Sequence, residues 1–136
     1  MVIIGIVGST AKRRQAVAER AATAEQARLL VHGMLNTSPH FESAGKSRAA
    51  RVDEMIGDCR GHVDGVIFSH LLTWEEAERL RELGGVVWHV EGMPSSHISI
   101  ERRDWMVTDV PGGQRHYLDP VEALSETLLH YARAAA

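Results

Sequence analysis

The stretch Val2-Ile-Ile-Gly-Ile-Val-Gly-Ser-Thr-Ala-Lys-Arg-Arg14 decides the fold of this chain. Its apolar run, residues 2–7, is too short for a helix and too continuous for a strand with one exposed face, so it predicts a strand buried on both faces of a parallel sheet. Gly8-Ser-Thr10 ends the run, and a long alanine-rich amphipathic segment follows. Such a turn brings backbone N–H groups, the positive end of a helix dipole and three cationic side chains together, which favours an anion.

Length and composition predict one domain. A chain of 136 residues with 44% hydrophobic content can bury one core. The formal net charge of -3 gives no overall positive field, so we expect no general nucleic-acid binding. Cys59 is the single cysteine and lies in an apolar-periodic segment, which indicates a buried residue and fits a reducing cytoplasm. No run approaches membrane-spanning length, so we expect no membrane partner and a cytoplasmic location.

Helical periodicity dominates the part of the chain that follows the first turn. Apolar residues recur at steps of three and four from Val17 to Met34, which predicts one helix that ends near Asn36. Turn-forming residues without a period occupy 36–45, and we interpret them as the longest loop, a place where lids over ligands tend to occur. The apolar positions between Val52 and Cys59 predict a second helix.

The second half of the chain alternates between predicted strands and helices. Buried strands are predicted at Val63 to Ser69 and at Val86 to Val90, with a short one at Trp105 to Val107. Thr73-Trp-Glu-Glu76 is typical of a capping box, and Asp119-Pro-Val-Glu122 is typical of a helix start. The predicted class is therefore α/β, a small and mainly parallel sheet of about four strands with helices on both faces. In such sheets ligands collect beyond the carboxyl ends of the strands. The residues expected on that rim are Gly8 to Arg14, Ser69, His70, Glu91, Thr108 and Asp109.

Three segments together carry a resemblance to a known family. They are Ile3-Ile-Gly-Ile-Val-Gly8, the segment from Glu76 to Val90, and His97-Ile-Ser-Ile-Glu101 ahead of Asp104-Trp-Met-Val107. With these segments the chain resembles bacteriophage-type deoxynucleoside monophosphate kinases of the P-loop fold. The resemblance thins out between about Leu29 and Arg60, where the family carries a larger helical insert. It implies a single P-loop-kinase-like domain over residues 1–136, a place in deoxynucleotide metabolism and, in an active member, the use of ATP and Mg²⁺.

The chain departs from the family at the positions that carry the chemistry. A P-loop has the pattern G-x-x-x-x-G-K-[ST], but counting from Gly8 places Arg13 at the second glycine, Arg14 at the lysine and Gln15 at the hydroxyl residue. The family's Asp-Val-Arg-Phe motif places His70 at the aspartate and Leu72 at the arginine. Phosphoryl transfer depends on positioning and charge neutralisation, so these losses predict that the chain no longer catalyses the reaction and has no metal site.

Our leading hypothesis is thus a kinase-like protein with a degenerate phosphate-binding loop that binds a nucleotide, another anionic ligand or a protein partner at the rim, with no cofactor and no assigned catalytic residue. The first alternative is an active ATP- and Mg²⁺-dependent deoxynucleoside monophosphate kinase. The second is an unrelated nucleotide-handling enzyme with His70 as acid or base. A homodimer is the default assembly. For each candidate an ordinary structural role remains open. The phosphate- or nucleotide-binding candidates are Gly8, Ser9, Thr10, Lys12, Arg13, Arg14 and His70, together with His97, Arg102 and Arg103, which the resemblance adds or supports.

Overall fold

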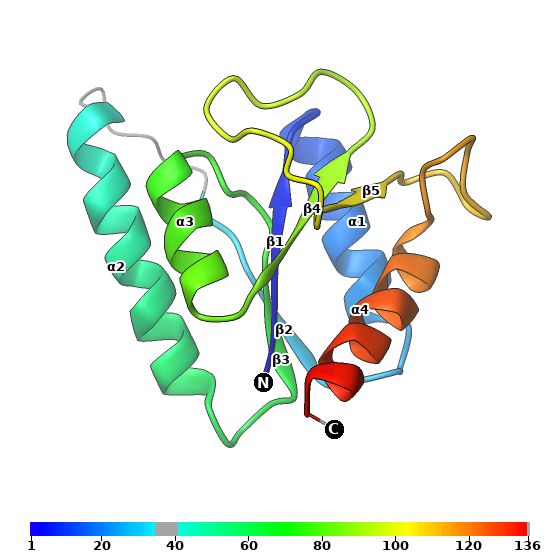
Figure 1. Ribbon diagram of the computed structural model, residues 1–136, viewed down its shortest axis with the longest axis horizontal. Helices are drawn as coiled ribbons and strands as arrows, with labels where there is room; N and C mark the ends of the chain where they lie inside the picture. The colour runs from blue at the N-terminus through cyan, green and yellow to red at the C-terminus, as the bar shows by residue number, and fades with distance from the viewer. Residues whose placement is uncertain (35–40, 136) are drawn as a thin grey trace.

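The apolar stretch at the start of the chain forms the central strand of a parallel sheet. In the computed structural model, which describes residues 1–34 and 41–135, five strands pair in the order β2-β3-β1-β4-β5, and every neighbouring pair is parallel (Figure 1). The described elements are β1 (Val2–Val7), α1 (Ala11–Ala22), β2 (Leu29–His32), α2 (Phe41–Cys59), β3 (Gly65–Phe68), α3 (Trp74–Glu82), β4 (Val86–Val90), β5 (Trp105–Val107) and α4 (Pro120–Ala135).

Two hydrophobic clusters hold the three layers together, one on each face of the sheet. Helices α1 and α4 cover one face, and α2 and α3 cover the other (Figure 1). Because side chains alternate along β1, Ile4 and Ile6 belong to the first cluster while Ile3 and Val7 belong to the second. All six residues of β1 are buried, so the prediction of a strand covered on both faces is confirmed.

The prediction of one helix as far as Asn36 is wrong. Helix α1 ends at Ala22 with Thr23 as its C-cap, and the chain then forms strand β2. This strand is easily missed, because it is short, lies at the edge of the sheet and pairs only with β3. Its residues Leu29 and Val31 pack against the same cluster as α1, and Val31 also falls on the helical stripe counted from Val17. The sheet consequently has five strands within the described residues, where about four were predicted.

The predicted loop at 36–45 is also wrong over the part that the structure describes. Residues 35–40 lie outside the described residues, but helix α2 already begins at Phe41. Gly45, which the sequence suggested as a turn residue, lies inside this helix. A Cβ at Gly45 would meet the carboxylate of Glu75, the far end of a flexible side chain of α3, so the glycine leaves room for that carboxylate beside α2. Residues 41–47 of the segment considered as a lid thus belong to α2, and residues 36–40 lie outside the described residues.

Most boundaries in the second half match the predictions. Strands β4 and β5 have the predicted ends, and Thr73 and Glu76 form the predicted capping box. The backbone N–H of Glu122 donates to Asp119 Oδ1 over 2.8 Å, as expected for the start of α4. Cys59 is buried, as predicted.

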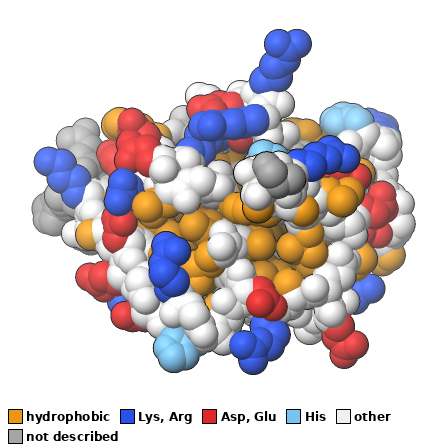
Figure 2. Space-filling view, turned by 60° about the horizontal axis from the view of Figure 1, so that its bottom comes forward, with side chains coloured by type: hydrophobic (Ala, Val, Ile, Leu, Met, Phe, Trp, Pro, Cys, Tyr) orange, Lys and Arg blue, Asp and Glu red, His pale blue; other side chains and the backbone are white. Residues whose placement is uncertain are grey.

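The face of the molecule at the amino end of β1 is partly apolar. Figure 2 turns the lower end of Figure 1 forward and shows apolar side chains gathered in the middle of that face, with charged side chains around them. Among the described helices none has the length and apolar character needed to cross a membrane.

Candidate functional site at the carboxyl ends of the strands

The loop after β1 lies where the connections of the sheet diverge. From β1 the chain crosses toward β2 at one edge, whereas from β4 it continues toward β5 at the other edge. Ligands of open α/β sheets bind in the crevice that such a divergence leaves at the carboxyl ends. Here the loop Gly8-Ser9-Thr10 occupies that position, and Thr10 caps α1 by accepting a hydrogen bond from the N–H of Arg13.

The loop does not present an open cradle of N–H groups. Gly8 and Ser9 both have positive φ angles, +83° and +57°, which is unusual for a serine. The Ser9 N–H donates to the carbonyl of Met93 over 2.8 Å. The carbonyls of Gly8 and Ser9 both accept hydrogen bonds from Arg14 Nη1, over 3.0 and 3.2 Å. In a phosphate-binding loop the N–H groups converge on the ligand, whereas here the Ser9 N–H and two loop carbonyls are bonded within the protein.

Arg14 is a buried cation without an acidic partner. Its side chain turns back under the loop, and the residue is 7% exposed. Besides the two loop carbonyls, its only hydrogen-bond acceptor is His70 Nδ1, which lies 3.1 Å from Nε. Within the described part of the chain no carboxylate contacts the guanidinium, and Nη2 has no hydrogen-bond partner. Burial lowers the pKa of Arg14, but an arginine keeps its charge at neutral pH. The two N–H donors on Nη2 thus have no partner among the described residues, and they remain accessible to solvent or to a ligand.

His70 is held in its neutral form beside this cation. Burial, together with the charges of Arg14 and Arg48, lowers its pKa to about 4. Because Nδ1 accepts from Arg14, the proton of the neutral ring is on Nε2. A divalent cation would have to share His70 with a guanidinium, so the residues at this strand end do not fit Mg²⁺.

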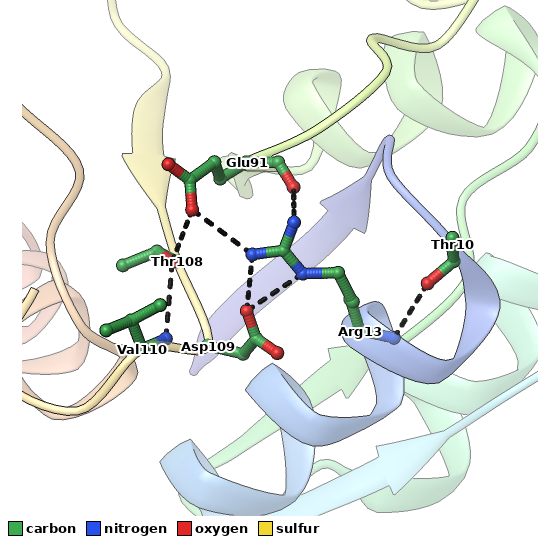
Figure 3. Close-up of polar contacts among 6 residues, drawn as sticks. All are labelled: Thr10, Arg13, Glu91, Thr108, Asp109 and Val110. Carbon is green, nitrogen blue, oxygen red and sulfur yellow. Dashed lines mark hydrogen bonds and ion pairs between the residues drawn. The ribbon is translucent and has the colours of Figure 1, made fainter. Parts of the chain in front are cut away.

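Arg13 faces the opposite side of the loop and is fully paired. Its guanidinium donates to Asp109 Oδ1 from Nε over 2.9 Å, to the carbonyl of Glu91 over 2.6 Å and to Glu91 Oε1 over 3.2 Å (Figure 3). The hydrogen bond to Asp109 is the main cause of a raised pKa at Arg13. Thr108 completes the group, since its hydroxyl donates to Glu91 Oε1 over 2.9 Å. We call Arg13, Glu91, Thr108 and Asp109 the Arg13 cluster. It ties the start of α1 to the ends of β4 and β5.

A buried ion pair lies next to His70. Arg48 Nε donates to Glu76 Oε1 over 2.6 Å, and both side chains are almost fully buried. Arg48 Nη2 also donates to the carbonyl of His70 over 2.9 Å. Glu76 serves the capping box as predicted, while its pairing with Arg48 was not predicted. No local pattern points to this pair, because Arg48 lies between the predicted loop at 36–45 and the predicted helix from Val52.

A cavity of about 300 Å³ opens between the loop and the segment that follows β4. Arg14 and His97 both line it, so two candidates far apart in the sequence meet there, and Met93, which is 80% exposed, also lines it. We call this space the rim cavity. Its full lining is Gly8, Ser9, Arg14, Leu71, Leu72, Met93, Pro94, Ser95, Ser96 and His97.

The remaining candidates do not reach the rim cavity. Lys12 is exposed on the first turn of α1. Arg102 is exposed, and Arg103 pairs with Glu101 over 3.0 Å. Arg103 and His97 line a neighbouring groove of about 500 Å³ against α3, whose upper end carries Trp74, 56% exposed. Neither Arg102 nor Arg103 belongs to the lining of the rim cavity, although the resemblance had implied a phosphate contact for both.

The fold and the rim together define an α/β protein with a strand–loop–helix unit at the divergence point of its sheet and one uncompensated buried cation beneath the loop. No described set of three His, Cys, Asp or Glu side chains is arranged to hold a metal ion. No family model, curated protein sequence or solved structure matches the chain.

Proposed function

We propose that this protein is a kinase-like P-loop-fold protein that binds a small anionic ligand in the rim cavity and does not transfer phosphoryl groups. The observation that carries the proposal is the buried charge of Arg14, which has no carboxylate partner among the described residues and has two N–H donors on Nη2 available beside a cavity. A buried charge of this kind is costly unless an opposite charge approaches it. An anion with several acceptor oxygens, such as a phosphate group, would satisfy both donors at once.

The kinase-like part of the proposal rests on the context of the loop. The loop after β1 joins the central strand to a helix that begins at Ala11, which is the strand–loop–helix arrangement of a P-loop. The positions that the motif assigns to a lysine and to a metal-binding hydroxyl residue have other roles here. Arg14 lies under the loop, and Gln15 donates to Glu19 on the exposed side of α1 over 3.0 Å. These contacts support the proposal that the loop occupies the P-loop position in the fold but lacks the lysine and the hydroxyl residue needed for catalysis.

The test of ligand binding uses the intact chain with inorganic phosphate and with each common deoxynucleoside monophosphate. At a ligand concentration about 100 times Kd, binding to the folded state adds about 2.7 kcal/mol and raises Tm by several degrees. Titration followed by NMR should shift the amide signals of Ser9 and Arg14 before those of other residues. The Arg14→Gln variant should lose the thermal shift, whereas Arg20→Gln, a matched change on the exposed side of the same helix, should keep it. A chain that gains no stability from any of these anions would overturn the proposal.

The active kinase is the competing proposal, and the placement of the loop and His97 at one cavity is the observation that favours it. It requires ATP- and Mg²⁺-dependent turnover of a deoxynucleoside monophosphate, measured in a coupled assay. We expect no turnover, because the residues at the end of β3 do not fit the metal. A rate that is abolished by Arg14→Gln and retained by Arg20→Gln would establish the kinase instead.

A further inference from the structure

The two flanks of the loop have opposite net charge. On the side of β3, Arg14 is a cation with neutral partners. On the side of β4 and β5, the Arg13 cluster places two carboxylates, those of Glu91 and Asp109, against one guanidinium (Figure 3). These side chains are partly accessible, with exposed fractions of 30% for Arg13, 20% for Glu91 and 30% for Asp109. The cluster therefore carries one net negative charge at the edge of the loop.

The Arg13 cluster is in direct reach of the loop. Gly92 follows Glu91, and a Cβ on Gly92 would lie 2.6 Å from Ser9 Oγ and 3.4 Å from Arg13 Nη1. Ser9 Oγ and the guanidinium of Arg13 thus both lie next to Gly92. Glu91 and Asp109 do not line the rim cavity, so a ligand would approach them only if it extended from Arg14 past Ser9 and Gly92.

We propose that Glu91 and Asp109 make the rim cavity selective against polyphosphates, so that added phosphate groups bring no gain in affinity. This inference rests on the proposed anion binding at Arg14. One phosphate group can be satisfied by Arg14 alone. A second or third phosphate that extends toward β4 would meet the Ser9 N–H, which is bonded to Met93, and Arg13, which is bonded to two carboxylates. Lys12 is exposed and does not line the cavity. The added phosphate would meet like charge beside Arg13, where a phosphate-binding loop offers opposite charge.

The test uses phosphate, pyrophosphate and tripolyphosphate without Mg²⁺, because this series changes the number of phosphates and adds no base or sugar. For the unmodified chain we expect affinity to stay level or fall from phosphate to tripolyphosphate, although the ligand charge rises. In the double variant Glu91→Gln/Asp109→Asn, the same side-chain shapes keep acceptors for Arg13 and lose both negative charges. We expect tripolyphosphate to bind at least tenfold more tightly to this variant and phosphate to change by less than threefold.

Two control proteins make the result specific. Asp58→Asn/Glu126→Gln changes the net charge equally at exposed positions and should leave the order of affinities as in the unmodified chain. Arg13→Gln keeps the carboxylates and removes their cation, so it should weaken pyrophosphate binding further and leave phosphate binding intact. Near-UV circular dichroism of each variant checks that the fold is retained.

The outcomes separate the two proposals. If the unmodified chain binds phosphate but the double variant shows no gain for tripolyphosphate, the selectivity inference is wrong and anion binding at Arg14 stands. If the unmodified chain binds tripolyphosphate much more tightly than phosphate, the inference is also wrong. If it binds none of the three anions, the proposed function itself fails and the selectivity inference fails with it.

Discussion

His70 links the chemistry of the rim to the stability of the protein. In the folded state its pKa is about 4, because the ring is buried and lies near Arg14 and Arg48, whereas an unfolded histidine has a pKa near 6.5. The unfolded state therefore takes up a proton first as the pH falls. The stabilisation is fully present above pH 6.5 and is lost progressively between about pH 6.5 and pH 4.

We expect the free energy of unfolding to fall by about 2 kcal/mol more in the unmodified chain than in His70→Asn when the pH is lowered from 7.5 to 4.5. Asparagine keeps an acceptor near the position of Nδ1 and does not titrate. Urea unfolding at both pH values measures the difference. The carboxylates of Asp53 and Asp104, whose pKa values are lowered, contribute equally to both proteins and cancel. Parallel pH dependences in the two proteins would show that His70 is not held neutral.

The ion pair of Arg48 and Glu76 gives a second prediction at the level of single residues. Glu76→Gln leaves a guanidinium that is 3% exposed without its countercharge, so the variant should lose about 3–5 kcal/mol of stability in urea unfolding. The matched control is Glu54→Gln, which breaks the exposed pair with Arg51 and should cost less than about 1 kcal/mol. Equal losses in the two variants would contradict a buried charge at Arg48.

The pairing of Arg13 and Arg14 shows where sequence reasoning stops at this scale. Both were candidates because they follow the loop, and the rule that places ligands at the carboxyl ends correctly brought Glu91, Asp109 and His70 to the same rim. The two arginines nevertheless have opposite surroundings. Successive residues of a helix point about 100° apart, so one faces β4 and β5 and the other faces β3. The sequence alone does not fix which of these directions leads to an acid.

At the scale of elements, the segment between β4 and β5 is held by one buried carboxylate. Asp104 Oδ2 accepts hydrogen bonds from His89 Nε2 over 2.7 Å, from Arg81 Nη2 over 2.8 Å and from the N–H of Glu101 over 2.9 Å. Burial alone would raise the pKa of Asp104, but these hydrogen bonds and the charge of Arg81 lower it overall. These hydrogen bonds to Asp104 matter for the rim cavity, because Met93 to His97 in the same segment line it.

Asp104→Asn should therefore loosen the segment without unfolding the sheet. We expect amide hydrogen exchange in residues 92–103 to accelerate at least tenfold, while exchange in β1 and β3 changes little. Mass spectrometry of peptides from the exchanged protein measures this. Asp58→Asn, an exposed residue of α2, serves as the control and should leave the segment unchanged. Faster exchange spread evenly over the whole chain would indicate global destabilisation instead of a local anchor.

The elements that the sequence predicted well are those with local signals. The capping box of Thr73 and Glu76 and the helix start at Asp119 rest on contacts within four residues, so the pattern contains all that is needed. Strand β2 has no such signal, because its partner β3 lies more than 30 residues away. Gly45 likewise has no local signal for a helix, and its neighbour, the carboxylate of Glu75, belongs to another helix. In both cases the structure depends on packing between elements that are far apart in the sequence.

At the scale of the whole molecule, the sheet separates two clusters that share no buried residue. Val17 on α1 lies in the cluster under α4, and Val52 on α2 lies in the cluster under α3. Both side chains are almost fully buried. They are connected through β1, whose alternate side chains enter both clusters, so loss of either layer exposes one face of the central strand. This arrangement predicts one folding unit over the described chain.

Val17→Ala and Val52→Ala should each cost about 1–3 kcal/mol, because each removes two buried methyl groups from a packed cluster. The sites lie on opposite faces and share no contacts, so the double variant should lose the sum of the two single losses to within about 0.5 kcal/mol. Circular dichroism of the backbone and fluorescence of Trp88, which is buried in the first cluster, should give one coincident urea transition in all three variants. Separate transitions for the two probes in Val52→Ala would mean that the layers unfold independently. In that case the loop after β1 would depend on only one of them, and the rim cavity could open while the α1 and α4 layer stays folded.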